Sequence, residues 1–203
     1  MNDTMRKKLL LAIAFAMGIW AYVLLLAATP KAGADAPAPI VKAIDLDEGI
    51  TPFFSPSGGC TDAIVAEIGK AKKSLDIQAF SFTSPSIAQA VADAQSRGVS
   101  VRVVLDKSQR TDHYSAATFL LNHGIPVYID EEHAIAHNKI ILIDGKTLIT
   151  GSFNFTTASE ERNAENLLII RNRPKLMIAY KGNFERHLSH SNPLTPAPVV
   201  HHD

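Results

Sequence analysis

Two hydrophobic patterns take turns along the chain from about residue 50 to residue 190. Stretches with apolar residues at helical spacing alternate with short, nearly continuous apolar runs. This alternation is typical of an α/β layered domain. It predicts helices over about 61–73, 85–97, 114–123 and 174–187, and strands over about 75–82, 99–105, 125–129, 139–143, 147–150 and 167–170.

Turn-forming residues set the limits of several of these elements. Pro85 stands at the first position of the second helix and Gly98 just past its end, which are the usual start and stop signals. Asp144-Gly145 separates two strands and favours a tight hairpin. The strands over 139–143 and 147–150 should therefore be antiparallel neighbours.

The N-terminal residues form a different kind of segment. An uncharged run begins at Leu9 and ends at Ala28, directly after three basic residues, and Ala32-Gly33-Ala34 matches the pattern that signal peptidase cuts after. We interpret residues 1–34 as a signal peptide or membrane anchor, with cleavage near Ala34 favoured. Basic residues before the run keep that end in the cytoplasm. We therefore expect the remaining protein to be periplasmic or secreted, or anchored in the inner membrane with its domain outside the cytoplasm.

The rest of the chain divides into three parts. The Pro/Ala-rich stretch over 35–50 is read as a linker, residues 51–190 as the folded domain and residues 191–203 as a flexible tail. Lys+Arg 20 balances Asp+Glu 20, so a local patch must hold any polyanion. The one cysteine, Cys60, excludes an internal disulfide and a cysteine-rich zinc site, and we interpret it as a small residue at a helix start.

A group of polar residues at fixed spacing carries the chemistry. His137-Asn138-Lys139 is followed after four residues by Asp144, and six residues later by Gly151-Ser152-Phe153-Asn154. His137 and Lys139 lie two apart in an extended segment, so their side chains should share one face. The hairpin should bring Ser152 and Asn154 to the same end, which makes a plausible site for a tetrahedral anion. A neutral imidazole there could attack phosphorus.

This arrangement, HxK(x)4D(x)6GSxN, resembles the signature of the phospholipase D superfamily, in particular its small single-motif bacterial nucleases. The resemblance extends from about Phe53 to His190 and includes 79–85 and 163–166. It implies a layered domain with a central mixed β-sheet flanked by helices. It also implies that Glu165 orients the histidine, that neither metal nor cofactor is needed, and that the products carry 5′-phosphate ends.

The chain contains one copy of the motif, whereas this chemistry needs a second histidine as acid. The resemblance therefore implies a homodimer whose active site lies on the two-fold axis. One His137 would attack to give a phosphohistidine, and its symmetry mate would protonate the leaving oxygen and then activate water. Lys139, Ser152 and Asn154 would bind the phosphate. For Asp144, which belongs to the signature, the sequence favours a turn or salt-bridge role over chemistry.

These features predict a metal-independent, low-specificity endonuclease that acts on DNA, and on RNA as a second substrate, outside the cytoplasm. One alternative is a lipid phosphodiesterase, held at a membrane by an uncleaved segment from Leu9 to Ala28. Another is a catalytically silent nucleic-acid-binding module. Four basic residues near Glu165 either contact a phosphate backbone or form a solvated rim: Arg162, Arg171, Arg173 and Lys175.

The remaining histidines are not expected to take part in chemistry. His133 lies four residues before His137, a spacing that binds metal on a helix, but this segment is not expected to be helical, so no metal site is predicted there. The others are interpreted as structural or surface residues: His113, His123, His187, His190, His201 and His202.

Overall fold

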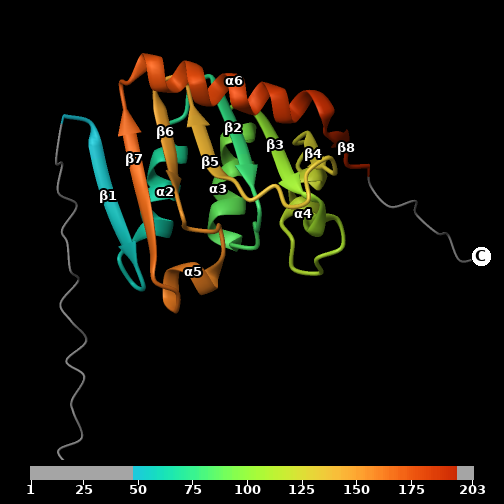
Figure 1. The fold of residues 1–203 in the computed structure, drawn as a ribbon, viewed down its shortest axis with the longest axis horizontal. Helices are drawn as coiled ribbons and strands as arrows, with labels where there is room; N and C mark the ends of the chain where they lie inside the picture. Colours follow the sequence, from blue (N-terminus) through green and yellow to red (C-terminus); the bar gives the residue numbers. More distant parts are fainter. Residues whose placement is uncertain (1–47, 196–203) are drawn as a thin grey trace, which may run out of the picture. The chain divides into compact units, whose positions relative to one another are not determined.

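The domain is built on one mixed sheet, described here from a computed structural model of residues 48–195. The expected leader over 1–34, nearly all of the linker and the tail from 196 onward lie outside the described residues. Eight strands follow the order β1-β7-β6-β5-β2-β3-β4-β8 (Figure 1). Their bounds are β1 Ile50–Ser55, β2 Ser74–Ala79, β3 Ser100–Asp106, β4 Val127–Asp130, β5 Lys139–Ile143, β6 Thr147–Gly151, β7 Glu165–Arg171 and β8 Asn192–Pro193.

Helices cover both faces of this sheet. The helical segments are α2 Cys60–Gly69, α3 Pro85–Ser96, the short 3₁₀ helix η1 Lys107–Arg110, α4 Ala117–Asn122, α5 Thr157–Glu161 and α6 Pro174–His190. α2, α3 and α4 pack on one face, where Ile141 and its neighbours form the larger core. α6 crosses the other face (Figure 1), where Phe184 packs against Ile140 and Leu142. Alternate residues of β5 therefore enter opposite cores, as the period of a strand requires. This is the layered α/β domain with a mixed sheet that the sequence predicted.

The hairpin predicted at Asp144-Gly145 is confirmed. β5 and β6 pair antiparallel, with Ile143 opposite Thr147. Asp144 and Gly145 both have positive φ, 54° and 67°, within a three-residue loop in which the N–H of Lys146 donates to the carbonyl of Ile143 at 2.9 Å. The turn thus returns β6 beside β5, and the segment after Gly151 beside the segment before Lys139.

Two helix boundaries differ from the prediction, and for the first the reason lies in contacts distant in sequence. The helix expected over 61–73 ends at Gly69, since the backbone N–H groups of Lys72, Lys73 and Ser74 donate to the Asp144 carboxylate instead of continuing the helix. The helix expected over 114–123 begins at Ala117. The hydrogen bonds to Asp144 are tertiary contacts, and local patterns in the sequence do not reveal such contacts.

Two edge strands and one helix were not predicted at all. β1 pairs antiparallel with β7 and includes Ile50, which lies in the stretch predicted to be a linker. β8 pairs with β4 through Tyr128 and Ile129, so the expected tail begins with an ordered strand at Asn192. α5 is a single short helix between β6 and β7. Between residues 48 and 195, no helix is both long and apolar enough to cross a bilayer.

Candidate active site

Four strand termini meet at one edge of the sheet. β7, β6, β5 and β2 are neighbours in the sheet order, and the start of β7, the end of β6, the start of β5 and the end of β2 lie at the same edge (Figure 1). The predicted site residues are at or beside these termini: Lys139 begins β5, Gly151 ends β6 and Glu165 begins β7. The strand order thus gathers polar side chains that are separate in sequence.

His137 precedes β5 and is held against the end of β2. The N–H of Phe80 donates to the carbonyl of Asn138 at 2.8 Å, which extends the β2–β5 ladder by one bond. The Phe80 ring lies against the imidazole, with ring centroids 4.6 Å apart. His137 itself is exposed. Its ring is therefore supported on one side and open to a ligand. Sequence reasoning did not assign this role to Phe80, because its closeness to His137 depends on the pairing of β2 with β5.

Lys139 places a buried positive charge beside the histidine. The residue is only 6% exposed, and its Nζ donates to the carbonyl of His137 at 3.1 Å and lies 5.1 Å from the centre of the Phe80 ring. Burial lowers the pKa of Lys139, while the negative charge of Glu165 opposes that shift. A partly desolvated ammonium interacts strongly with an anion, because little water competes for it.

The segment after β6 is fixed by a close approach to β7. Gly151 has a φ of 150°, and a Cβ at this position would lie 2.3 Å from the backbone oxygen of Asn166. Ser152 Oγ accepts from the N–H of Asn166 at 3.0 Å and from its side-chain Nδ2 at 3.2 Å. With both acceptor positions used, the Ser152 hydroxyl hydrogen is free to donate to an anion.

The same loop is anchored by two buried phenylalanines. Phe153 is 0% and Phe155 1% exposed, and Phe155 forms a parallel bridge with Phe82 just beyond β2. Asn154 lies between these two anchors. Its buried Oδ1 has no hydrogen-bond partner among residues 48–195. An orphaned buried amide oxygen is costly within a fold, which is typical of a group kept for a ligand or a second chain.

Glu165 is close enough to Lys139 to influence its pKa. Its Oε1 accepts a hydrogen bond from Asn163 Nδ2 at 3.1 Å, and its backbone N–H donates to Ser55 Oγ. The orienting role toward His137 stays a prediction.

Asp144 lies at the opposite end of β5, five residues after Lys139. Its carboxylate accepts backbone N–H groups from Lys72 at 2.9 Å, Lys73 at 2.7 Å and Ser74 at 3.0 Å. These bonds tie the β5–β6 turn to the start of β2. The contacts match the structural role favoured from the sequence.

An open groove adjoins the histidine on the face covered by α6. It has a volume of about 360 Å³ and is lined by His137, by residues near the start of β5 and the end of β6, and by Tyr180 and Asn183 of α6. Tyr180 and Asn183 lie three apart and so share one side of the helix. No pattern in the sequence points to these two residues, because the position of α6 over the sheet is set by its packing.

The basic residues near Glu165 in sequence are not gathered at this site. β7 is extended, so Arg171 lies about 20 Å from Glu165, at the other edge of the sheet. There it pairs with Glu67 at 2.8 Å. Arg173, which donates to the carbonyl of Glu48, and Lys175 follow Arg171 at that edge. Of the two alternatives left open by the sequence, this separation argues against contact with a phosphate at the site for these three residues.

A mixed sheet covered on both faces, with a histidine–lysine pair and a serine–asparagine loop at one edge, defines the phospholipase D class of phosphodiester hydrolases. Residues 64–188 match the family model described as "Cardiolipin synthase, PLD-like domain". The chain therefore belongs to the phospholipase D superfamily, and the protein is a phosphodiester hydrolase of that superfamily.

Known proteins agree with this assignment. Phospholipase D of Rickettsia prowazekii is 43% identical over 143 residues, covering 70% of this chain and 69% of the relative. Mitochondrial cardiolipin hydrolase of Xenopus tropicalis is 37% identical over 117 residues, covering 58% of this chain and 55% of the relative. The crystal structure of Nuc from Salmonella typhimurium, a phospholipase D family member, has a TM-score of 0.70 at 35% identity and covers 72% of this chain and 98% of Nuc.

Proposed function

We propose that this protein is a metal-independent endonuclease that cleaves DNA, and RNA as a second substrate, through a phosphohistidine intermediate. The main support is the exposed His137 ring, held by Phe80 beside the buried ammonium of Lys139. Such a pair combines a nucleophile with a fixed positive charge, which is what attack on a phosphodiester requires.

The reaction proceeds in two displacements. Neutral His137 attacks phosphorus, a phosphorus–nitrogen bond forms, and the bond to the leaving oxygen breaks as a second imidazole donates a proton to it. That second imidazole then takes a proton from water, which attacks the phosphohistidine and releases a 5′-phosphate end. Lys139 and the free hydroxyl hydrogen of Ser152 stabilise the negative charge on the nonbridging oxygens.

The second imidazole comes from a partner copy of the chain. Each chain carries one motif, and a two-fold axis near the exposed His137 would bring two copies together. The unpartnered buried Oδ1 of Asn154 is then available to the bound substrate or to the partner. We therefore propose a homodimer as the active species.

Nucleic acid is favoured as the substrate by the size of the domain. The described residues form one compact layered domain, and its structural counterpart Nuc is covered over 98% of its length, so few insertions are left to bind acyl chains. The groove beside His137 is open to solvent, as access by a polymer backbone requires.

A lipid phosphodiesterase is the second candidate. The relative named mitochondrial cardiolipin hydrolase, at 37% identity, supports it. Retention of the segment from Leu9 to Ala28 would hold the site near a bilayer. Both candidates use the same phosphoryl chemistry at His137 and differ in what the groove accepts.

Purified protein is incubated with supercoiled plasmid and, separately, with vesicles of phosphatidylcholine or cardiolipin, with EDTA added together with the substrate. We expect nicked and linear DNA with ligatable 5′-phosphate ends and no lipid turnover. His137→Ala should abolish cleavage, whereas His123→Ala, a change at an exposed histidine that contacts Phe119, should not. Cleavage of lipid alone would replace the nuclease proposal with the lipid one.

Subunit mixing tests the shared site. Wild-type protein and the His137→Ala variant are combined in equal amounts and allowed to exchange. If each site uses one histidine from each protomer, about a quarter of the dimers cleave; independent protomers would retain about half of the activity. A protein that is monomeric and fully active in light scattering would refute the dimer.

The proposed nuclease would act outside the cytoplasm. A leader over residues 1–34 would deliver the domain to the periplasm or outside the cell, or anchor it in the inner membrane. Mass spectrometry of the protein recovered from each cell fraction shows whether its first residue follows Ala34, and recovery in the cytoplasm alone would contradict export.

A further inference from the structure

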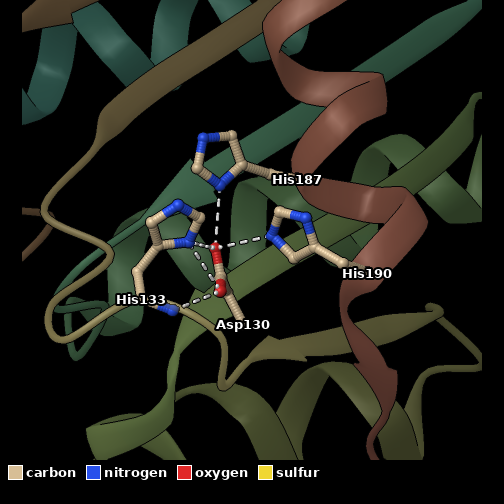
Figure 2. A group of neighbouring side chains, drawn as sticks. All are labelled: Asp130, His133, His187 and His190. Atoms are coloured by element: carbon tan, nitrogen blue, oxygen red, sulfur yellow. Dashed lines mark hydrogen bonds and ion pairs between the residues drawn. The ribbon is translucent and has the colours of Figure 1, made fainter.

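Three histidines and one aspartate meet at the end of the sheet near the last turn of α6. Asp130 ends β4 and is 0% exposed, and His133 follows in the next loop. His187 and His190 come from the last turn of α6. Figure 2 shows the three imidazole rings arranged around the Asp130 carboxylate. None of these four residues belongs to the proposed active site.

The four potential donor atoms converge. Asp130 Oδ2 lies 3.0 Å from His133 Nδ1, 2.8 Å from His187 Nδ1 and 3.3 Å from His190 Nε2. One donor atom from each of the four residues lies within 4.8 Å of all the others. Such convergence of three imidazoles on one buried oxygen brings together side chains that are strongly hydrated when separate.

Hydrogen bonding alone does not satisfy this cluster. His133 and His187 hydrogen-bond to Asp130, but the buried Nε2 of His190 has no hydrogen-bond partner among residues 48–195, although it faces the same carboxylate. A buried ring nitrogen without a partner is costly. A cation among the four groups would accept the lone pair of each ring at once.

A carboxylate outside the four-residue cluster also favours metal binding by the cluster. His190 Nδ1 faces Glu132 Oε2 at 3.5 Å. A carboxylate on the far nitrogen of an imidazole keeps the proton there and leaves the other nitrogen to bind metal, which is the usual second-shell arrangement of a histidine ligand.

We propose that Asp130, His133, His187 and His190 bind one Zn²⁺ ion as a four-coordinate structural site. Three imidazoles and a carboxylate are ligands that Zn²⁺ accepts, and four protein ligands leave no open position for chemistry. Tetrahedral ligands at about 2.0–2.1 Å from zinc are about 3.3 Å from each other. The separations from Asp130 Oδ2, 2.8, 3.0 and 3.3 Å, are close to this value, and His133, whose side chain is 44% exposed, can rotate inward.

The ion would fasten two parts of the chain that are distant in sequence. It would tie the end of α6 to the loop over 131–136, which leads directly to His137. The far end of this loop is already held, because the N–H of Ala136 donates to Asp106 Oδ2 at 2.7 Å. Zinc would therefore brace the backbone that carries the nucleophile without contacting the substrate.

The test measures metal binding directly. The full chain is purified without a polyhistidine tag, freed of metal with a chelator and titrated with Zn²⁺ alone or Co²⁺ alone. We expect one Zn²⁺ per chain by elemental analysis and the intense visible absorption of four-coordinate Co²⁺. A hundredfold excess over the dissociation constant should raise the melting temperature by about 5–10 °C.

Single ligand changes show where the ion binds. His187→Gln should weaken Zn²⁺ binding by more than the 10–100-fold typical of outer-shell changes. His133→Gln, a change at an exposed loop position, should do the same with little risk to folding. Two controls should retain binding: His123→Gln, and the double change His201→Ala with His202→Ala, which removes the histidine pair near the end of the chain.

Three results would overturn the proposal: substoichiometric metal, a weak six-coordinate Co²⁺ spectrum, or unchanged affinity in His133→Gln. These measurements do not depend on cleavage, so they stand even if the nuclease proposal fails. Conversely, activity that survives brief EDTA but fades together with zinc content and melting temperature would assign the metal to structure and leave the metal-independent chemistry intact.

Discussion

Replacing Asp144 should destabilise the fold and leave the chemistry largely unchanged. The carboxylate accepts the N–H groups of Lys72, Lys73 and Ser74, at the opposite end of β5 from the proposed nucleophile. Hydrogen bonds to a charged group contribute about 1.5–3 kcal/mol each. Because this turn is partly open to water, we take about 1 kcal/mol each.

Asp144→Ala therefore loses about 3 kcal/mol from the hydrogen bonds, and about 1 kcal/mol more because alanine must adopt the φ of 54°. This is a large share of the 5–15 kcal/mol that typically holds a domain folded. Asp144→Asn tolerates the same φ and keeps one acceptor oxygen, so it should lose only about 1–2 kcal/mol. The order of stability should be Asp, then Asn, then Ala.

The pH dependence gives an independent check. Burial alone would raise the pKa of Asp144, but the hydrogen bonds from Ser74, Lys73 and Lys72 bring it below its usual value in the folded protein. A lowered folded pKa means that the stabilisation is present above the unfolded value of about 3.9 and is lost as the pH falls through the folded pKa. The difference between wild type and Asp144→Asn should thus shrink below about pH 4.

Urea unfolding followed by circular dichroism measures these differences, and turnover is measured at a temperature where every variant is folded. We expect the unfolding midpoints to shift while kcat changes by less than about tenfold. A variant with an unchanged midpoint and a kcat reduced more than about a hundredfold would refute the structural assignment and place Asp144 in the chemistry.

Three further substitutions test the active site. Lys139→Met keeps the bulk of a side chain that is 6% exposed but removes its charge, so turnover should fall about 10²–10³-fold while the melting temperature holds or rises; full activity would contradict its role. Phe80→Leu removes the ring beside His137 and should lower kcat by about tenfold with KM unchanged in steady-state assays; wild-type kcat would argue against this support. Gly151→Ala puts a Cβ 2.3 Å from the backbone oxygen of Asn166, so the free energy of unfolding in urea should fall by about 2 kcal/mol or more, and an unchanged midpoint would contradict so close an approach.

Helix starts and the hairpin turn could be predicted, because the residues that determine them are neighbours in the sequence. Pro85 begins α3, as the sequence pattern indicated, and Ser84 caps it. Asp144-Gly145 specifies its own turn, and the turn fixes the pairing of β5 with β6. The spacing of the motif then brings Ser152 to the same edge as Lys139, because each lies at the end of the hairpin away from the turn.

The edge strands could not be predicted in the same way. β1 contains Pro52, which normally weakens a strand assignment and is tolerated only at an edge. β8 consists of Asn192 and Pro193 and exists only because β4 offers it a partner. In both cases the strand is defined by hydrogen bonds to a distant element, which no window of the sequence contains.

The histidine cluster shows how closeness in sequence can mislead. His133 lies four residues before His137, a spacing that can bind metal on a helix. In the structure it lies instead beside Asp130 and the end of α6. His187 and His190 carried a signal of their own, since residues three apart on a helix face the same way. Their partner Asp130 lies 57 residues before His187, so only the fold could supply the carboxylate.

The active-site contacts and the histidine cluster at Asp130 both bear on the position of the His137 side chain. His137 is held from the β2 side by Phe80 and by the backbone bond to Asn138. On the other side, the preceding residue Ala136 donates its N–H to Asp106, and the loop before Ala136 contains His133, which contacts Asp130. In the proposed two-fold site, His137 would have to meet its symmetry mate with little freedom, because small displacements in such geometry cost large factors in rate. A cation at His133 would further restrict the exposed loop over 131–135 that leads to Ala136 and His137.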